Sequence, residues 1–315
     1  MSRGGLLSVV TPAFNEAGNL PVVHQRLAAV LAGLEWEWIV VDDHSSDGTF
    51  GVVTAMVEQD PRVRGFRLAR NSGSHTAIAC GLDYARGEAA VVLAADLQDP
   101  PEAMPELLAH WRDGAQVVWA ARESAPLASK AYYLAMRKIT GMEGMPAAGA
   151  DFFLVDRAVI EAFRLFREQH TSIFALIAWM GFRQSTVGYG KEPRLQGKSG
   201  WTLAKKAALL IDSITAFTSA PIRLMTYVGL VTALLGFLYA AFVFVLALRG
   251  NPVQGWASLM VVVLVVGGIQ MLMMGVLGEY VWRALDETRR RPRYLIEEST
   301  GAEAPVAPVP RSERQ

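Results

Sequence analysis

Several features common in other protein classes are missing from this sequence. It contains one cysteine, Cys80, so an intrachain disulfide is excluded and a zinc site built from several thiolates is not available. Its five histidines are scattered and show no H-E-x-x-H spacing, which also argues against zinc. The formal net charge is zero, because 30 Lys and Arg residues balance 30 Asp and Glu residues. Bulk electrostatics therefore does not favour nucleic acid as a partner.

Two phosphate-binding motifs are missing as well. The segment after the first apolar run reads Pro-Ala-Phe-Asn-Glu over residues 12–16, without the glycines of a dinucleotide-binding G-x-G-x-x-G turn. The sequence also has no G-x-x-x-x-G-K-[ST] P-loop. A nucleotide site in this chain therefore has to be built from other side chains.

Charge is scarce along part of the chain. Charged residues make up 19% of the sequence and hydrophobic residues 52%, and the mean hydropathy is +0.25. Residues 224–248 and 250–278 contain no Asp, Glu, Lys, Arg or His. As a helix the first stretch reaches about 37 Å, enough to cross a hydrocarbon core of about 30 Å. The second opens with a turn, so its apolar part starts near Trp256. Two buried helices of a soluble core are the alternative, which such long uncharged runs disfavour.

The charged residues that flank the two predicted spans indicate which side of the membrane each end of the hairpin faces. Cations precede the first span and follow the second, whereas the connection holds only Arg249. The positive-inside rule then places both ends, and the long N-terminal part, in the cytoplasm. We expect no signal peptide, because the apolar run at residues 6–10 is too short. Residues 201–222 fit an amphipathic helix, lying either on the membrane surface or against the soluble domain.

The first 200 residues alternate short apolar runs with helical patterns. Repeated strand–helix units predict a mostly parallel sheet with helices on both faces and a ligand site beyond the carboxyl ends of its strands. Polar clusters at residues 15–16, 42–45, 71–73 and 96–99 follow four successive predicted strands. One such cluster would be helix capping, but four on one rim predict a binding site. The strands are expected at 6–11, 38–41, 63–68, 89–93 and 117–120, and the helices up to about 34, up to about 59 and over 76–85.

The rim is rich in carboxylates. Carboxylate oxygens accept hydrogen bonds from a base and a ribose. They also hold Mg²⁺ or Mn²⁺, which prefer oxygen ligands and bridge protein carboxylates to a diphosphate. The rim therefore favours a nucleotide that arrives with a divalent cation.

Four segments together resemble glycosyltransferase family 2 with a GT-A fold: T-P-A-F-N-E at 11–16, V-D-D-H-S-S-D-G-T at 41–49, N-S-G at 71–73 and D-L-Q-D-P-P-E at 96–102. The segment G-A-D-F-F-L-V-D-R at 149–157 and the G-K-S at 197–199 narrow the likeness. They are similar to the polyprenyl-phosphate glycosyltransferases, which include dolichol-phosphate mannose synthase and bacterial undecaprenyl-phosphate sugar transferases. The resemblance covers residues from about 6 to 290.

The resemblance implies inverting transfer of a sugar from a nucleotide sugar to polyprenyl phosphate, with UDP favoured over GDP. It implies Mg²⁺ or Mn²⁺ as cofactor, and a homo-oligomer. The resemblance also implies roles for individual residues. Nucleotide binding is expected of Pro12, Phe14, Glu16, Asp42, Asp43 and Asn71, and metal binding of Asp96 and Gln98. Catalysis is expected of Asp151 and Asp96, and binding of the diphosphate or lipid phosphate of Arg122, Lys130, Arg194 and Lys198.

Three positions depart from the family pattern. Ala94 stands where the first aspartate of D-x-D is expected, which removes one metal ligand. Phe153 replaces an arginine, and Ser74 replaces a lysine. The second pKa of a phosphate monoester is about 6, so the nucleophile is largely ionised at neutral pH. A strong general base is not required, and we interpret Asp151 as an orienting or electrostatic group first and a base second.

The predicted organisation has four parts. A cytoplasmic GT-A (Rossmann-like) α/β domain at 1–200 precedes a juxtamembrane amphipathic helix at 201–222, a two-span hairpin at 223–283 and a basic tail at 284–315 that ends in disorder. We expect a multi-pass protein of the bacterial inner membrane, acting on the cell envelope. A processive polysaccharide synthase would need a Q-x-x-R-W motif and more spans. A non-catalytic membrane scaffold is the other alternative, favoured by Ala94.

Overall fold

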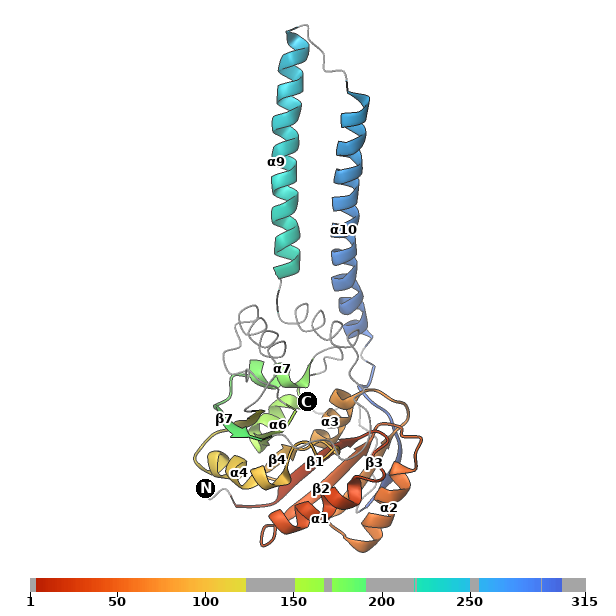
Figure 1. Ribbon diagram of the computed structural model, residues 1–315, viewed down its shortest axis with the longest axis vertical. Helices are drawn as coiled ribbons and strands as arrows, with labels where there is room; N and C mark the ends of the chain where they lie inside the picture. The colour runs from red at the N-terminus through yellow and green to blue at the C-terminus, as the bar shows by residue number, and fades with distance from the viewer. Residues whose placement is uncertain are drawn as a thin grey trace, which may run out of the picture. The chain divides into compact units, whose positions relative to one another are not determined.

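The computed structural model describes residues 4–122, 151–166, 172–190, 218, 220–249, 255–289 and 291–301 (Figure 1). The described residues divide into two compact units, one within residues 1–209 and 292–315 and the other within residues 210–291. The first unit holds a β-sheet and its covering helices, and the second holds two long helices.

The first unit is built on one mixed sheet of eight strands in the order β7-β5-β6-β4-β1-β2-β3-β8. β1 pairs in parallel with both β2 and β4, and β2 pairs in parallel with β3. The chain therefore moves outward from β1 to β3 and then returns to the other side of β1. This reversal is the kind of switch point at which open α/β sheets bind ligands. The strands are β1 Leu7–Ala13, β2 Trp36–Asp42, β3 Val63–Leu68, β4 Ala89–Val92, β5 Val117–Arg122, β6 Phe153–Asp156, β7 Gln184–Tyr189 and β8 Ile296–Thr300.

The remaining strands complete the sheet in mixed orientation. β6 is antiparallel to β4 and β5, β7 is parallel to β5, and β8 is antiparallel to β3. The predicted mostly parallel α/β sheet is confirmed for the first four strands, and all five predicted strands are present. The strand β8 differs from the expectation of a tail over 284–315. Its sequence, Ile-Glu-Glu-Ser-Thr, lacks an apolar run because it lies at the sheet edge with exposed side chains.

Helices cover both faces of this sheet. They are α1 Leu20–Val30, α2 Thr49–Gln59, α3 Ser74–Tyr84, a 3₁₀ turn η1 Pro101–Ala103, α4 Met104–Arg112, α6 Arg157–Phe163 and α7 Ile173–Trp179. Val9 belongs to the cluster beneath α1 and α4, whereas Val10 lies against α3. Because neighbouring strand residues point to opposite faces, α3 lies on the other side of the sheet. The approach is close, since a Cβ on Gly81 would lie 2.2 Å from Val10 Cγ1.

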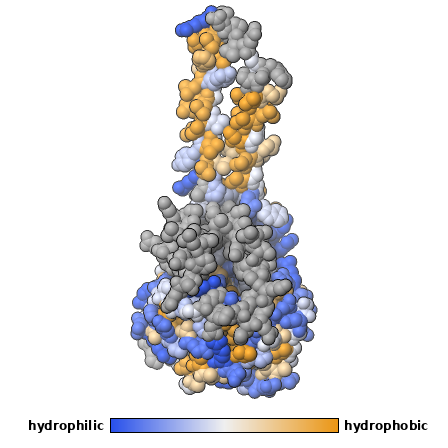
Figure 2. Space-filling model, in the orientation of Figure 1, coloured by the Kyte–Doolittle hydropathy of each residue, from blue (hydrophilic) through white to orange (hydrophobic). Residues whose placement is uncertain are grey.

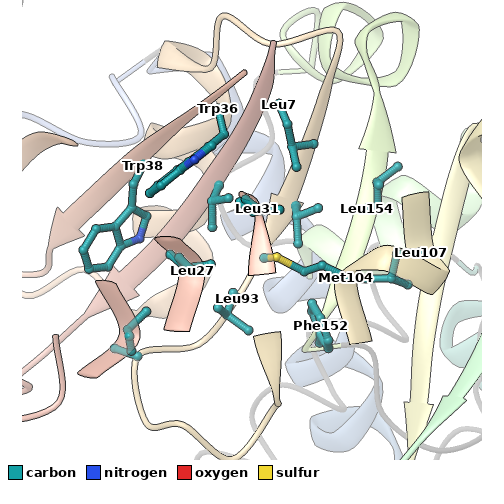
Figure 3. Packing of buried hydrophobic residues seen from close by; sticks show 14 of the residues in the cluster. Leu7, Leu27, Leu31, Trp36, Trp38, Leu93, Met104, Leu107, Phe152 and Leu154 are labelled. Carbon is teal, nitrogen blue, oxygen red and sulfur yellow. The ribbon is translucent and has the colours of Figure 1, made fainter. Parts of the chain in front are cut away.

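One hydrophobic cluster fills the space between the sheet and helices α1 and α4 (Figure 3). Leu27 of α1, Met104 and Leu107 of α4 and Trp38 of β2 are all fully buried there. The Trp38 indole N–H donates to Thr11 Oγ1 at 2.9 Å, so its polar atom is satisfied inside the core. This packing gives the loops at the strand ends a rigid base.

The second unit consists of α9 Ala220–Leu248 and α10 Trp256–Thr288. Both are long and apolar enough to cross a membrane, and apolar side chains line them along their length (Figure 2). The two predicted spans are therefore present as helices. α10 continues past the uncharged stretch that ends at 278 and five residues past the predicted end of the hairpin at 283, and in its polar last turns Arg283 pairs with Glu279 at 2.9 Å. The predicted juxtamembrane helix at 201–222 lies outside the described residues, apart from Thr218 and residues 220–222.

Candidate functional site

The loops that follow β1 and β2 form one hydrogen-bonded unit at the carboxyl ends of these strands. The Asn15 N–H donates to Ser45 Oγ at 2.9 Å, and the Ser46 N–H donates to Asn15 Oδ1 at 2.9 Å. The Glu16 N–H donates to Thr49 Oγ1 at 3.0 Å. The first two predicted motifs, about 30 residues apart in sequence, therefore do meet in space. Around them Phe14 is exposed and Pro12 and Glu16 are half-buried, so these side chains are accessible.

The two adjacent aspartates after β2 have different partners. Asp43 accepts the backbone N–H groups of Ser72 at 2.7 Å and Gly73 at 2.8 Å, which ties this loop to the one after β3. Burial raises the pKa of Asp43 above its ordinary value, although both N–H groups oppose the shift. Asp43 therefore holds the loops after β2 and β3 together.

Asp42 is fully buried, and within the described ranges only one of its two oxygens has a hydrogen-bond partner. Oδ1 accepts the Ser45 N–H at 3.0 Å, whereas Oδ2 accepts no hydrogen bond from the described residues. Arg67 Nη1 lies 3.6 Å from Oδ2. A buried acceptor left open costs free energy, so native proteins rarely retain one without a reason. Asp42 is thus the rim carboxylate best placed to accept a ligand donor.

The loop after β4 carries the predicted metal ligands. Gln98 donates its backbone N–H to Asp96 Oδ1 at 3.2 Å across Leu97, whose φ is +57°, and both side chains are half-buried. Among the residues that the structure describes, no three His, Cys, Asp or Glu side chains converge on one position. One carboxylate and one amide oxygen nevertheless fit a hard cation that takes its other ligands from water and a diphosphate.

A chain of contacts through Arg122 and Tyr189 links Asp151 to the loop after β4. Arg122, at the end of β5, donates from Nη2 to Asp151 Oδ2 at 2.7 Å and also interacts with Tyr189. The Tyr189 hydroxyl donates to Asp99, which is buried. Burial alone would lower the pKa of Arg122, but Asp151 and Tyr189 together raise it. The guanidinium is therefore a permanently charged group with a set orientation, suited to binding an anion.

His75 was not among the predicted site residues. Its Nδ1 accepts the Ile173 N–H at 3.3 Å, so the neutral ring carries its proton on Nε2. Nε2 is buried and has no hydrogen-bond partner in the part of the chain that the structure describes. Burial lowers the pKa of His75 to about 4, opposed by the charge of Asp151. No sequence pattern marks this residue beyond its place two residues after the N-S-G motif.

Several predicted site residues are not connected in this way. Asn71 is exposed at the loop after β3. Lys130, Arg194 and Lys198 lie outside the described residues, so their predicted phosphate contacts stay predictions. The structure brings together the loops of Asp42, Asp43 and Asn71, and a separate chain of contacts joins Asp151 to the loop of Asp96 and Asp99.

Two family models match this chain. Residues 8–184 match glycosyl transferase family 2, and residues 220–283 match the GtrB C-terminal hairpin. The first match covers the sheet through the start of β7, and the second covers α9 and most of α10. The boundary between the two matches therefore follows the division into two units.

Similar proteins match this chain over nearly the whole of both sequences. An uncharacterized glycosyltransferase of Synechocystis is 36% identical over 94% of this chain and 96% of its own length. A prophage bactoprenol glucosyl transferase homolog of Escherichia coli K12 is 34% identical over 92% of this chain and 98% of its own. The bactoprenol glucosyl transferase of Shigella phage SfV is 34% identical over 92% of this chain and 97% of its own.

Solved structures are more distant. Glucosyl-3-phosphoglycerate synthase from Mycobacterium tuberculosis, in complex with Mn²⁺, UDP-glucose and phosphoglyceric acid, is 17% identical over 67% of this chain and 78% of its own, with a TM-score of 0.49. The two family matches and the full-length relatives suffice for the assignment: the chain belongs to glycosyl transferase family 2, as a membrane-associated glycosyltransferase with a GtrB-type hairpin.

Proposed function

We propose that this glycosyltransferase moves a sugar, with inversion, from a nucleotide sugar to polyprenyl phosphate at the cytoplasmic face of a bacterial inner membrane. One observation carries the proposal. A family 2 domain is joined in one chain to an uncharged two-helix hairpin, over the same length as in proteins named bactoprenol glucosyl transferases. The hairpin would hold the enzyme where a lipid acceptor resides.

The nucleotide would bind on the rim after β1, β2 and β3. Its base or ribose would donate to Oδ2 of Asp42, the buried oxygen that has no hydrogen-bond partner within the described ranges. Asp43 would act indirectly, because its oxygens already accept two backbone N–H groups. The accessible side chains nearby (Pro12, Phe14, Glu16 and Asn71) would line the same site, with UDP favoured.

Asp96 and Gln98 would hold Mg²⁺ or Mn²⁺ together with the diphosphate of the donor. When bound, the cation supplies positive charge that stabilises the leaving diphosphate. Since Ala94 removes one carboxylate, the protein contributes little of the coordination shell, and the nucleotide contributes the rest.

The reaction would be a single displacement at the anomeric carbon. An oxygen of polyprenyl phosphate forms the new C–O bond while the bond to the nucleoside diphosphate breaks and its electron pair leaves with the diphosphate. The acceptor phosphate is already ionised at neutral pH, since its second pKa is about 6. Arg122 would bind phosphate, and Asp151 would orient that guanidinium, which the 2.7 Å contact between them supports. Lys130, Arg194 and Lys198 would add positive charge.

A non-catalytic membrane scaffold is the second candidate, and Ala94 is the observation that favours it. One experiment separates the two. The purified full chain in detergent is incubated with undecaprenyl phosphate and a panel of UDP- and GDP-sugars, with Mn²⁺, with Mg²⁺ and with a chelator. We expect a lipid-linked sugar whose anomeric configuration is opposite to that of the donor. Folded protein that binds nucleotide but transfers no sugar would support the scaffold instead.

A further inference from the structure

The segment that follows α10 in the sequence returns to the sheet of the first unit. We call residues 292–301 the C-terminal strap. Its strand β8 pairs with β3, and Leu295 O accepts the Ala69 N–H at 2.9 Å just before the strand begins. The Tyr294 hydroxyl donates to Asp83 Oδ2 at 2.9 Å, and Arg293 lies over the Phe163 ring at 5.0 Å. The strap is thus attached along its length.

A glycine in β3 leaves space for the side chains of this strap. Gly65 of β3 lies opposite Thr300, and a Cβ on Gly65 would be 2.8 Å from Thr300 Cγ2 and 2.5 Å from Val53 Cγ1. Any larger residue at this position would displace one of these side chains. The absence of a side chain at Gly65 therefore allows β8 to pack directly against β3.

The pairing is irregular beside the functional rim. Arg67 lies opposite Glu298 and Leu68 lies opposite Ile296, which leaves Glu297 as an extra residue in the strap. A β-bulge of this kind redirects a side chain, and bulges are common next to active sites. Glu297 at this position contacts the guanidinium of Arg67 and the imidazole of His44. Its Oε2 lies 3.0 Å from Arg67 Nε and 3.3 Å from His44 Nδ1.

Arg67 connects the strap to the rim. While Glu297 accepts from its Nε, Nη2 of Arg67 donates to Ser45 O at 3.2 Å. The remaining nitrogen, Nη1, lies 3.6 Å from the open Oδ2 of Asp42, too far for a good hydrogen bond. Two carboxylates therefore share one planar guanidinium, and Glu297 has the shorter contact.

We propose that Glu297 is a positioning residue for the donor nucleotide, because it holds Arg67 away from Asp42 and so keeps Oδ2 of Asp42 open. Without that carboxylate, Arg67 turns toward Asp42 and forms the close ion pair that the structure avoids. The nucleotide then has to displace Arg67 in order to bind. This inference rests on the proposed role of Asp42 in nucleotide binding.

The test compares Glu297→Gln with Glu298→Gln, since each removes one exposed negative charge from the same strand. Glu298 lies opposite Arg67 in the strand pair, but within the described part of the chain it is the carboxylate of Glu297 that pairs with the side chains of Arg67 and His44. The affinity for UDP is measured by calorimetry, and KM and kcat for the sugar donor are measured with undecaprenyl phosphate. For Glu297→Gln we expect roughly 3- to 10-fold weaker UDP binding and a similar rise in KM, with kcat within about 2-fold of wild type. Glu298→Gln should match wild type. Equal UDP affinity and KM in both variants would overturn the proposal.

A double-mutant cycle excludes a merely structural effect. If Glu297 acts by holding Arg67 away from Asp42, Glu297→Gln causes no loss of UDP affinity in an Arg67→Gln background, because the side chain that would block Asp42 is gone. The same loss in both backgrounds would contradict this route. The Ser45 amide donates to Asp42, so its hydrogen exchange reports on whether Glu297 holds Arg67 away from Asp42. This measurement applies even if the wild-type protein binds no nucleotide and the proposed function fails. Altered exchange in Glu297→Gln but not in Glu298→Gln supports this role of Glu297, and equal exchange overturns it.

Discussion

Asp42 and Asp43 are neighbours in sequence, yet their asparagine variants should fail in different ways. Oδ2 of Asp42 is buried without a hydrogen-bond partner among the described residues, whereas both oxygens of Asp43 accept backbone N–H groups. Asp42→Asn therefore removes charge from an atom that accepts no hydrogen bond from these residues. Asp43→Asn instead turns one acceptor into an NH₂ group that faces the N–H of Ser72 or Gly73.

The magnitudes follow from these contacts. A hydrogen bond to a charged group contributes about 1.5–3 kcal/mol, so Asp42→Asn should weaken UDP binding roughly 10- to 150-fold. Its melting temperature should stay the same or rise, because a buried charge with an unmade hydrogen bond is removed. Asp43→Asn leaves a backbone donor unsatisfied and should lower the stability of the first unit by about 1–3 kcal/mol.

The assay uses the full chain in detergent for both variants. Calorimetry with UDP in the presence of Mn²⁺ gives the affinity, and intrinsic fluorescence on heating gives the melting temperature. We expect Asp42→Asn to lose affinity at an unchanged melting temperature and Asp43→Asn to melt earlier. The reasoning is refuted if Asp42→Asn binds UDP as tightly as wild type, or if Asp43→Asn keeps the wild-type melting temperature.

Three further predictions concern other parts of the site. Asp151→Asn should lower kcat about 10- to 100-fold while changing the KM of the nucleotide donor little, because Arg122 loses its orienting partner; initial rates at saturating lipid check this, and a normal kcat contradicts it. Ala94→Asp should restore a second carboxylate and lower the Mn²⁺ concentration needed for half-maximal rate, which a metal titration measures; an unchanged midpoint argues against a metal at Asp96. His75 has its pKa lowered from 6.5 to about 4, so its contribution to stability is present above pH 6.5 and is lost as the pH falls toward 4. The melting temperature of His75→Gln should therefore fall less than that of wild type between pH 7 and pH 4.5, and equal falls would contradict the buried neutral ring.

Part of this architecture can be read from the sequence because local pattern and tertiary environment agree there. The sequence predicts a strand at residues 63–68, and β3 forms over that range, a short segment with Val63, Phe66 and Leu68 bounded by Pro61 and Asn71. The polar rim was predictable for a topological reason. Parallel strands end on one side of a sheet, so residues that follow successive strands have to gather.

Other features depend on contacts that no local pattern encodes. The strand β8 reads as a polar tail, and its pairing partner β3 lies some 230 residues earlier in the chain. His75 looks like an ordinary helix residue until the N–H of Ile173, 98 residues later, fixes its tautomer. The difference between Asp42 and Asp43 depends on which oxygen meets which backbone donor, and alternation of residue types along a strand carries no such information.

The two buried atoms without hydrogen-bond partners give a physical reason to regard this rim as a binding site. Among the described residues, Asp42 Oδ2 is an open acceptor and His75 Nε2 is an open donor. Each unmade hydrogen bond costs about 1–3 kcal/mol, a large share of the net stability of a domain. A fold selected for stability alone would replace both side chains. Asp42 follows β2 and His75 lies in the first turn of α3, just after the loop that Asp43 holds, and a polar ligand such as a nucleotide sugar offers both donors and acceptors for such atoms.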